Sequence, residues 1–132
     1  MNRRNQRHAF TLVEMIMVIV IMGLLAAVVM PKFTDMKTEA QNAAEEATVA
    51  AVRSGIKLAH MTTLAQGQDG YPAKLDSAKN AVGSETNELF TEVIEDGVTD
   101  GNWKKNNKTT YQYVPTGNKY KYDKIEGTFT KQ

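Results

Sequence analysis

The side chain with the clearest potential for chemistry in this sequence is the carboxylate of Glu14. It is the only charged group between Ala9 and Met30, in a run that is otherwise almost wholly apolar. A carboxylate in an apolar helix costs on the order of 2.5 to 3.5 kcal/mol on membrane-insertion scales, so it normally needs a partner. No basic residue follows near enough on the same helix to supply one. The chemistry that we expect of Glu14 is therefore ion pairing with a cation from another source.

Composition excludes most other kinds of chemical site. The 132 residues include no cysteine, which excludes disulfides, thiolate metal sites and cysteine nucleophiles. The two histidines, His8 and His60, are too few for a multi-histidine metal site, and no phosphate-binding glycine loop or Gly-x-Ser-x-Gly sequence is present. A net charge of +1 gives no general reason to expect nucleic-acid binding. We predict no catalytic residue, no metal and no cofactor, and we do not expect an enzyme.

The element that must position Glu14 is an apolar segment behind a basic leader. Residues 1–9 carry three arginines and no acid, and the apolar run extends from Phe10 to Met30. Positive charge stays on the cytoplasmic side of a membrane segment, so the leader should begin inside the cell. At about 1.5 Å per residue the run spans roughly 30 Å, which is the thickness of the hydrocarbon core.

Two simpler explanations of this segment fit less well. A secretory signal peptide usually has a shorter apolar region and a small-residue cleavage site on its far side. A plain single-pass anchor, which would belong to a membrane-anchored binding protein, gives no reason for Glu14. Cleavage before Phe10 would create an α-amino cation close to Glu14, on the same or a neighbouring chain. A cleaved protein that assembles with its own copies therefore explains the acid best.

The sequence Ala9-Phe10-Thr11-Leu12-Val13-Glu14 resembles the class III signal of type IV pilins and type II secretion pseudopilins. In that family a prepilin peptidase cuts just before the phenylalanine and methylates the new amino terminus. The resemblance implies cleavage between Ala9 and Phe10 and N-methylation of Phe10. The sequence departs from the family pattern at Ala9, where glycine is usual. Alanine is also small, so we expect cleavage to be slower or unchanged, and not lost.

The resemblance also implies roles for other residues and a set of partners. Glu14 would set the register between subunits, and Gly23 and Pro31 would mark a stretch of helix that kinks or melts in a filament. Glycine costs about 1 kcal/mol in a helix and proline removes a backbone donor, which agrees with that role; small-residue packing is the alternative for Gly23. The implied partners are further copies of the chain, the prepilin peptidase, an assembly platform protein with its ATPase, and the inner membrane.

We expect the helix to continue beyond the apolar segment of residues 10–31, as an amphipathic helix over residues 32–67. Apolar or small residues recur there every three or four positions, which predicts one buried face. The predicted buried stripe comprises Phe33, Met36, Ala40, Ala43, Ala47, Ala50, Ser54, Leu58, Met61 and Ala65. Charged residues that include Glu45 and Arg53 are assigned to the solvated faces, and His60 is interpreted as a polar or packing residue.

The remaining residues predict a small β-sheet after a connecting region. Residues 68–101 should connect, with one short helix over 85–94 that Ser84 starts and the Asp96-Gly97 turn ends. Residues 102–132 alternate apolar and polar positions between turn residues, which predicts an antiparallel meander of three or four strands on the long helix. The predicted fold is therefore α+β and pilin-like. We interpret Trp103 and the tyrosines as core residues; aromatic stacking for electron transport or adhesion is the alternative.

Charge and missing features bear on the subtype. Residues 69–100 carry eight acids and residues 101–132 carry seven lysines, which could pair between neighbouring subunits or simply be solvated. No disulfide-bounded loop is present, and Asp123 and Glu126 alone are a poor calcium site. We favour a type IV pilus subunit that moves from the inner membrane to an extracellular filament. The alternative is a pseudopilin in a periplasmic pseudopilus.

Overall fold

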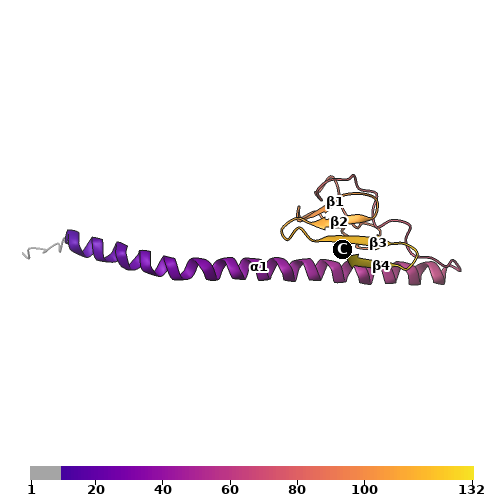
Figure 1. Cartoon of the computed structure of the whole chain (residues 1–132). Helices are drawn as coiled ribbons and strands as arrows, with labels where there is room; N and C mark the ends of the chain where they lie inside the picture. Colours follow the sequence, from indigo (N-terminus) through magenta and orange to yellow (C-terminus); the bar gives the residue numbers. More distant parts are fainter. Residues whose placement is uncertain (1–9) are drawn as a thin grey trace, which may run out of the picture. The chain divides into compact units, whose positions relative to one another are not determined.

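The computed structural model describes residues 10–132; the predicted leader, with Ala9, lies outside the described residues. The chain divides into two compact units, with the boundary between Glu39 and Ala40. We call residues 40–132 the head. Helix α1 spans Leu12–Ala65 and therefore supplies residues to both units. Four strands follow it: β1 at Trp103–Lys105, β2 at Thr110–Tyr113, β3 at Lys119–Asp123 and β4 at Thr128–Lys131 (Figure 1).

The strands form one antiparallel meander in the order β1-β2-β3-β4. Tyrosines face the same side because alternate residues of a strand share a face. The register places Trp103 opposite Tyr113 and Tyr111 opposite Tyr120. The turns next to the strands use glycines with positive φ, which glycine adopts at low cost: Gly101 before β1, Gly117 between β2 and β3, and Gly127 between β3 and β4. The α+β fold predicted from the sequence is confirmed.

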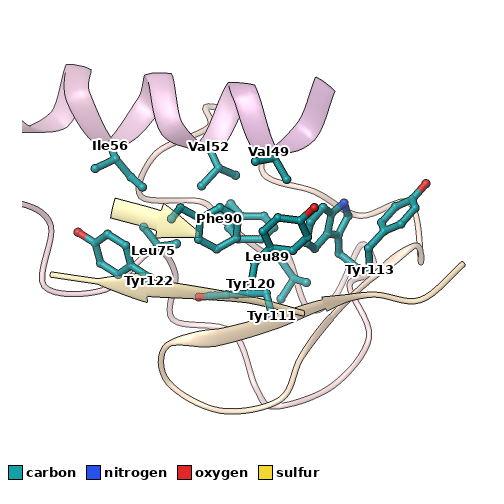
Figure 2. Close-up of a cluster of buried hydrophobic side chains, with 12 residues drawn as sticks. Val49, Val52, Ile56, Leu75, Leu89, Phe90, Tyr111, Tyr113, Tyr120 and Tyr122 are labelled. Carbon is teal, nitrogen blue, oxygen red and sulfur yellow. The ribbon is translucent and has the colours of Figure 1, made fainter. Parts of the chain in front are cut away.

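The core of the head is an aromatic cluster between the sheet and the last third of α1. Val49, Val52 and Ile56 point from the helix into this cluster (Figure 2). Phe90 lies against Tyr111 and Trp103, with ring centroids 4.5 Å and 5.6 Å away. The buried members are Val49, Val52, Ile56, Leu75, Leu89, Phe90, Trp103, Tyr111, Tyr113, Tyr120, Tyr122 and Phe129. The interpretation of Trp103 and the strand tyrosines as core residues is confirmed.

The buried face of the helix differs from the predicted stripe. Leu58 and Met61 were expected in the stripe, but each is 66% exposed. The buried positions are instead Glu45, Val49, Val52 and Ile56. Alanines occur on several faces of this helix, so the spacing of small and apolar residues does not by itself identify the face that the sheet covers. The assignment of Glu45 to a solvated face was therefore wrong.

The short helix predicted over residues 85–94 is not formed. That stretch consists of turns and isolated bridges, with Leu89 bridged to Val98 and only one helical turn, in which Ile94 N donates to Phe90 O. Phe90 has φ of 63°, in the left-handed region that a right-handed helix excludes. Its backbone N–H donates to a buried carboxylate, Oδ2 of Asp76, at 3.0 Å. Leu89 and Phe90 are both buried, and the contacts that bury them hold this stretch in a non-helical conformation.

Candidate functional site

The candidate site at the start of α1 is built around Thr11 and Glu14. The N–H and hydroxyl of Thr11 both donate to Oε2 of Glu14, at 2.8 Å and 2.9 Å. In return, the backbone N–H of Glu14 donates to the Thr11 hydroxyl at 3.3 Å. This reciprocal pattern is a capping box, in which the two side chains satisfy donors that the first turn of a helix leaves free. It holds the Glu14 carboxylate in one orientation beside the amino end of the helix.

The pairing of Thr11 with Glu14 was not predicted from the sequence, although the pattern Thr-x-x-Glu before an apolar run is typical of a helix start. The capping box occupies one carboxylate oxygen of Glu14. Within residues 10–132, no donor is recorded for the other oxygen, Oε1. Glu14 and Phe10 are both exposed, and Phe10 is 80% exposed. The arrangement leaves an oriented anionic oxygen on Glu14 and an exposed Phe10 side chain, both open to another molecule.

The helix around this site is apolar and has no cover within its own unit. Residues 12–36 expose a long series of valine, isoleucine, leucine and methionine side chains, with exposed fractions from 44% to 75%. By length and composition α1 contains a segment that can cross a membrane, and none of that segment is buried. Exposed apolar surface of this extent marks a membrane or protein contact. Either environment would also surround Glu14, which increases the cost of leaving its charge unpaired.

Gly23 and Pro31 both lie inside α1, which the structure describes as continuous through them. Proline has no backbone N–H, so the carbonyl of Ala27 lacks its usual helical donor. A Cβ added at Gly23 would meet nothing within 4 Å. The helix therefore lacks one backbone hydrogen bond, at Ala27. At Gly23, no neighbouring atom of the described chain requires the absence of a side chain.

A second polar centre, in the head, joins the helix to the sheet through Glu45. Its carboxylate accepts hydrogen bonds from the hydroxyls of Thr116 and Tyr120, each at 2.6 Å, and from Nδ2 of Asn118 at 2.8 Å. Burial opposes ionisation, but these three donors and the charge of Lys131 outweigh it and hold the pKa of Glu45 below its ordinary value. Burial and the bond to Glu45 raise the pKa of Tyr120 to about 12. An ionised Glu45 that accepts hydrogen bonds from three side chains is suited to a structural role, in which it fixes the helix to the sheet.

A third polar centre, also in the head, surrounds the buried carboxylate of Asp76. It forms an ion pair with Lys105 and accepts a hydrogen bond from the Tyr111 hydroxyl at 2.8 Å. The backbone N–H of Phe90 and that of Ala78 also donate to it, each at 3.0 Å. Burial and the charge of Asp76 raise the pKa of Tyr111 well above its ordinary value. Every one of these contacts comes from within the head, which indicates a structural role.

Comparisons with known proteins agree with the N-terminal part of this description. Residues 4–30 match the family described as the prokaryotic N-terminal methylation motif. The chain is also similar to the type IV narrow pilus major component PilA5 of Thermus thermophilus, with 48% identity over 50 residues. That segment is 38% of this chain and 43% of the relative, so the match covers less than half of the relative's length. No solved structure matches the chain.

Proposed function

We propose that this chain belongs to the type IV pilin and pseudopilin family and is a structural subunit of a type IV pilus. The methylation motif at its N-terminus and the similarity to a pilin support this proposal. The observation that carries the proposal is the Glu14 carboxylate, held by Thr11 with Oε1 directed to no other described residue. An unpaired carboxylate is unstable in an apolar environment, whereas a pair with an ammonium group removes most of the penalty. Glu14 would therefore admit only subunits whose amino terminus is in register.

In this proposal a prepilin peptidase cleaves between Ala9 and Phe10 and methylates Phe10. The mature chain remains in the inner membrane through residues 10–31, with its head outside the cytoplasm. A platform protein and an ATPase then transfer it into a homo-oligomeric helical filament. The apolar side chains of α1 exchange lipid for sister subunits, so their burial is kept during the transfer. The finished filament is extracellular for a pilus and periplasmic for a pseudopilus.

Gly23 and Pro31 would supply the flexible stretch of this filament. The carbonyl of Ala27 already lacks a helical donor because Pro31 has no N–H, so unwinding the helix there breaks fewer hydrogen bonds than elsewhere. Glycine lowers the cost further, since it is about 1 kcal/mol less favourable than alanine in a helix. A Gly23→Ala substitution should therefore stiffen this stretch.

An intact-mass measurement on the chain isolated from its native envelope tests processing. The proposal expects loss of residues 1–9 and the addition of one methyl group. Isolation of the full-length, unmodified chain as a monomer would instead favour a plain membrane-anchored binding protein. A mature chain found only with secretion machinery and never in extracellular fibres would favour the pseudopilin alternative.

Two substitutions of Glu14 separate its charge from its capping role. Glutamine can replace glutamate in a capping box, so Glu14→Gln retains the helix start but removes the charge. We expect both Glu14→Gln and Glu14→Ala to insert, to be cleaved and to assemble poorly. Thr11→Val is the matched control, because it removes the side-chain cap and keeps the acid. Normal filament yield from Glu14→Gln would show that the charge does not control assembly.

A further inference from the structure

Four lysines surround one surface hollow of the head. The hollow has a volume of about 430 Å³, and Lys74, Lys105, Lys108 and Lys124 line it together with Asp76. Asp76 pairs with Lys105, and this is the one ion pair found among residues 10–132. The other three lysines are exposed and have no acidic partner within 4 Å in the described chain. Like charges at one site repel each other, so this lysine hollow favours an anionic occupant.

The same head also presents an acidic turn, over residues 84–88. The turn is closed by two backbone hydrogen bonds. Ser84 N donates to Asn87 O at 3.2 Å, and Asn87 N donates to Ser84 O at 2.9 Å. The Asn87 side chain anchors it, because Oδ1 accepts from Lys79 N at 2.8 Å and Nδ2 donates to Val82 O at 3.1 Å. Glu85 stands at the tip, and Glu88 follows; both are exposed.

The acidic turn is held by backbone and amide hydrogen bonds, and its two carboxylates have no basic partner within 4 Å among the described residues. Lys79 lines the neighbouring surface with Glu85 and Glu88, which leaves the turn with one excess negative charge. A short, hydrogen-bonded, negatively charged turn and a lysine-lined hollow therefore occur on the same head. A contact between two different surfaces of one chain can repeat from copy to copy.

We propose that the lysine hollow of one subunit receives the acidic turn of a neighbouring copy of this chain. The inference rests on the proposed function, because it assigns a head contact within the filament. Glu85 and Glu88 lie opposite Lys108 and Lys124 in this contact, where charge complementarity selects the partner and its register. Single exposed ion pairs contribute little, so the effect comes from several charges acting together in each repeated contact.

A neighbouring copy fits the observations better than a nucleic acid. The lysine hollow is a single concavity, whereas binding to a nucleic-acid backbone generally uses a row of cations along a groove or a face. The chain itself carries the complementary acids in an ordered turn. Assembly also places copies next to each other at high effective concentration, which favours weak repeated contacts.

Charge-reversal variants expressed as the full chain in the native host test the contact. Lys108→Glu with Lys124→Glu should be cleaved and membrane-inserted as usual but should lower filament yield by at least about tenfold, because like charges then oppose each other. Glu85→Lys with Glu88→Lys should have the same effect. A chain with all four substitutions should recover filaments, which also shows that the heads fold. Lys119→Glu with Lys121→Glu makes the same charge change on β3, outside the hollow, and should assemble normally.

Each possible result has a distinct meaning. Normal filaments from the Lys108 and Lys124 variant, or no recovery in the four-substitution chain, would overturn the contact and leave the proposed function intact. Absence of filaments and of processing in the unsubstituted chain would instead overturn the proposed function. A single-stranded oligonucleotide mixed with the purified full chain provides the second probe. Binding that the Lys108 and Lys124 reversals abolish while filaments stay normal would assign the hollow to nucleic acid instead.

Discussion

Glu45 is the residue that joins the long helix to the β2–β3 hairpin. Only 3% of the residue is exposed, and its carboxylate accepts hydrogen bonds from three side chains of the segment between β2 and β3 and of β3 itself. An acceptor removed from such a site leaves buried donors without partners, at a cost of about 1 to 3 kcal/mol. The attachment of the helix to this hairpin therefore depends on the Glu45 carboxylate as a hydrogen-bond acceptor, in addition to side-chain packing.

We predict that Glu45→Ala lowers the free energy of unfolding of the head by about 2 to 4 kcal/mol, since it leaves three donors unpaired and removes buried side-chain volume. The measurement is thermal or urea unfolding of the detergent-solubilised chain, followed by the fluorescence of the buried Trp103. Glu46→Ala is the control, because Glu46 is exposed on the next position of the helix. Equal effects of the two substitutions would contradict the anchor role.

The same residue predicts how stability responds to acid. The pKa of Glu45 is lower in the folded head than its ordinary value of about 4.3. The stability that it contributes is therefore complete above the unfolded pKa and is lost as pH falls through the folded pKa. We expect the difference in stability between the unsubstituted chain and Glu45→Gln to be largest at neutral pH and to shrink as the pH falls below the ordinary glutamate pKa and through the lower folded pKa. A constant difference from pH 7 to pH 3 would show that ionisation of Glu45 is not involved.

Asp76 is the second residue whose loss should be severe. Asp76→Asn leaves the buried Lys105 charge without its partner, which typically costs about 3 to 5 kcal/mol. Tyr111→Phe removes one hydrogen bond to the same carboxylate and should cost about 1 kcal/mol. The combination of Asp76→Asn with Lys105→Met should recover part of the loss, because no unpaired charge remains. Unfolding midpoints of the three variants test this order, and an equal loss in Tyr111→Phe would refute it.

At the scale of elements, two glycines of α1 have opposite requirements. A Cβ at Gly55 would lie 1.9 Å from the backbone oxygen of Val93, whereas Gly23 has nothing within 4 Å. Gly55 thus permits the close approach of the 91–95 turn to the helix. We predict that Gly55→Ala destabilises the head by about 1 to 3 kcal/mol, as overpacking does, while Gly23→Ala leaves the unfolding midpoint of the head unchanged. A stable Gly55→Ala head would mean that the turn can move away without loss.

The elements also separate what a sequence predicts well from what it does not. The strands were predictable because Tyr111, Tyr113, Tyr120 and Tyr122 alternate with polar residues between turn residues, and the period of 2 is a local property. The start of the helix was equally local, and its Thr11 and Glu14 pattern was available in the sequence. Local patterns of this kind need no knowledge of distant parts of the chain.

Two errors have a common physical cause. Glu45 was assigned to solvent because its three donors belong to residues more than 70 positions away, which a helical periodicity does not register. The 85–94 stretch was assigned to a helix because its end signals are local, but the backbone N–H of Phe90 bonds to Asp76 instead. In both places a long-range polar contact overrides the local preference.

At the scale of the whole molecule, the two units differ in whether they bury their own apolar side chains. Every buried residue of the described chain lies at or after position 45, so the head contains its own core. Residues 12–36 contribute exposed apolar side chains and no buried ones. A unit with its own core can fold alone, whereas an uncovered apolar helix requires lipid or other copies.

We therefore predict that a fragment of residues 40–132 is a folded, soluble monomer that does not form filaments. It retains all twelve buried apolar residues of the core and both buried carboxylates, so its Trp103 fluorescence and unfolding midpoint should be close to those of the full chain in detergent. Sedimentation should show a monomer, because the few head contacts that remain are weak without the helices to concentrate them. An unfolded fragment would mean that residues 10–39 are needed for the head to fold. A fragment that polymerises by itself would show that head contacts suffice for assembly and that pairing at Glu14 does not control it.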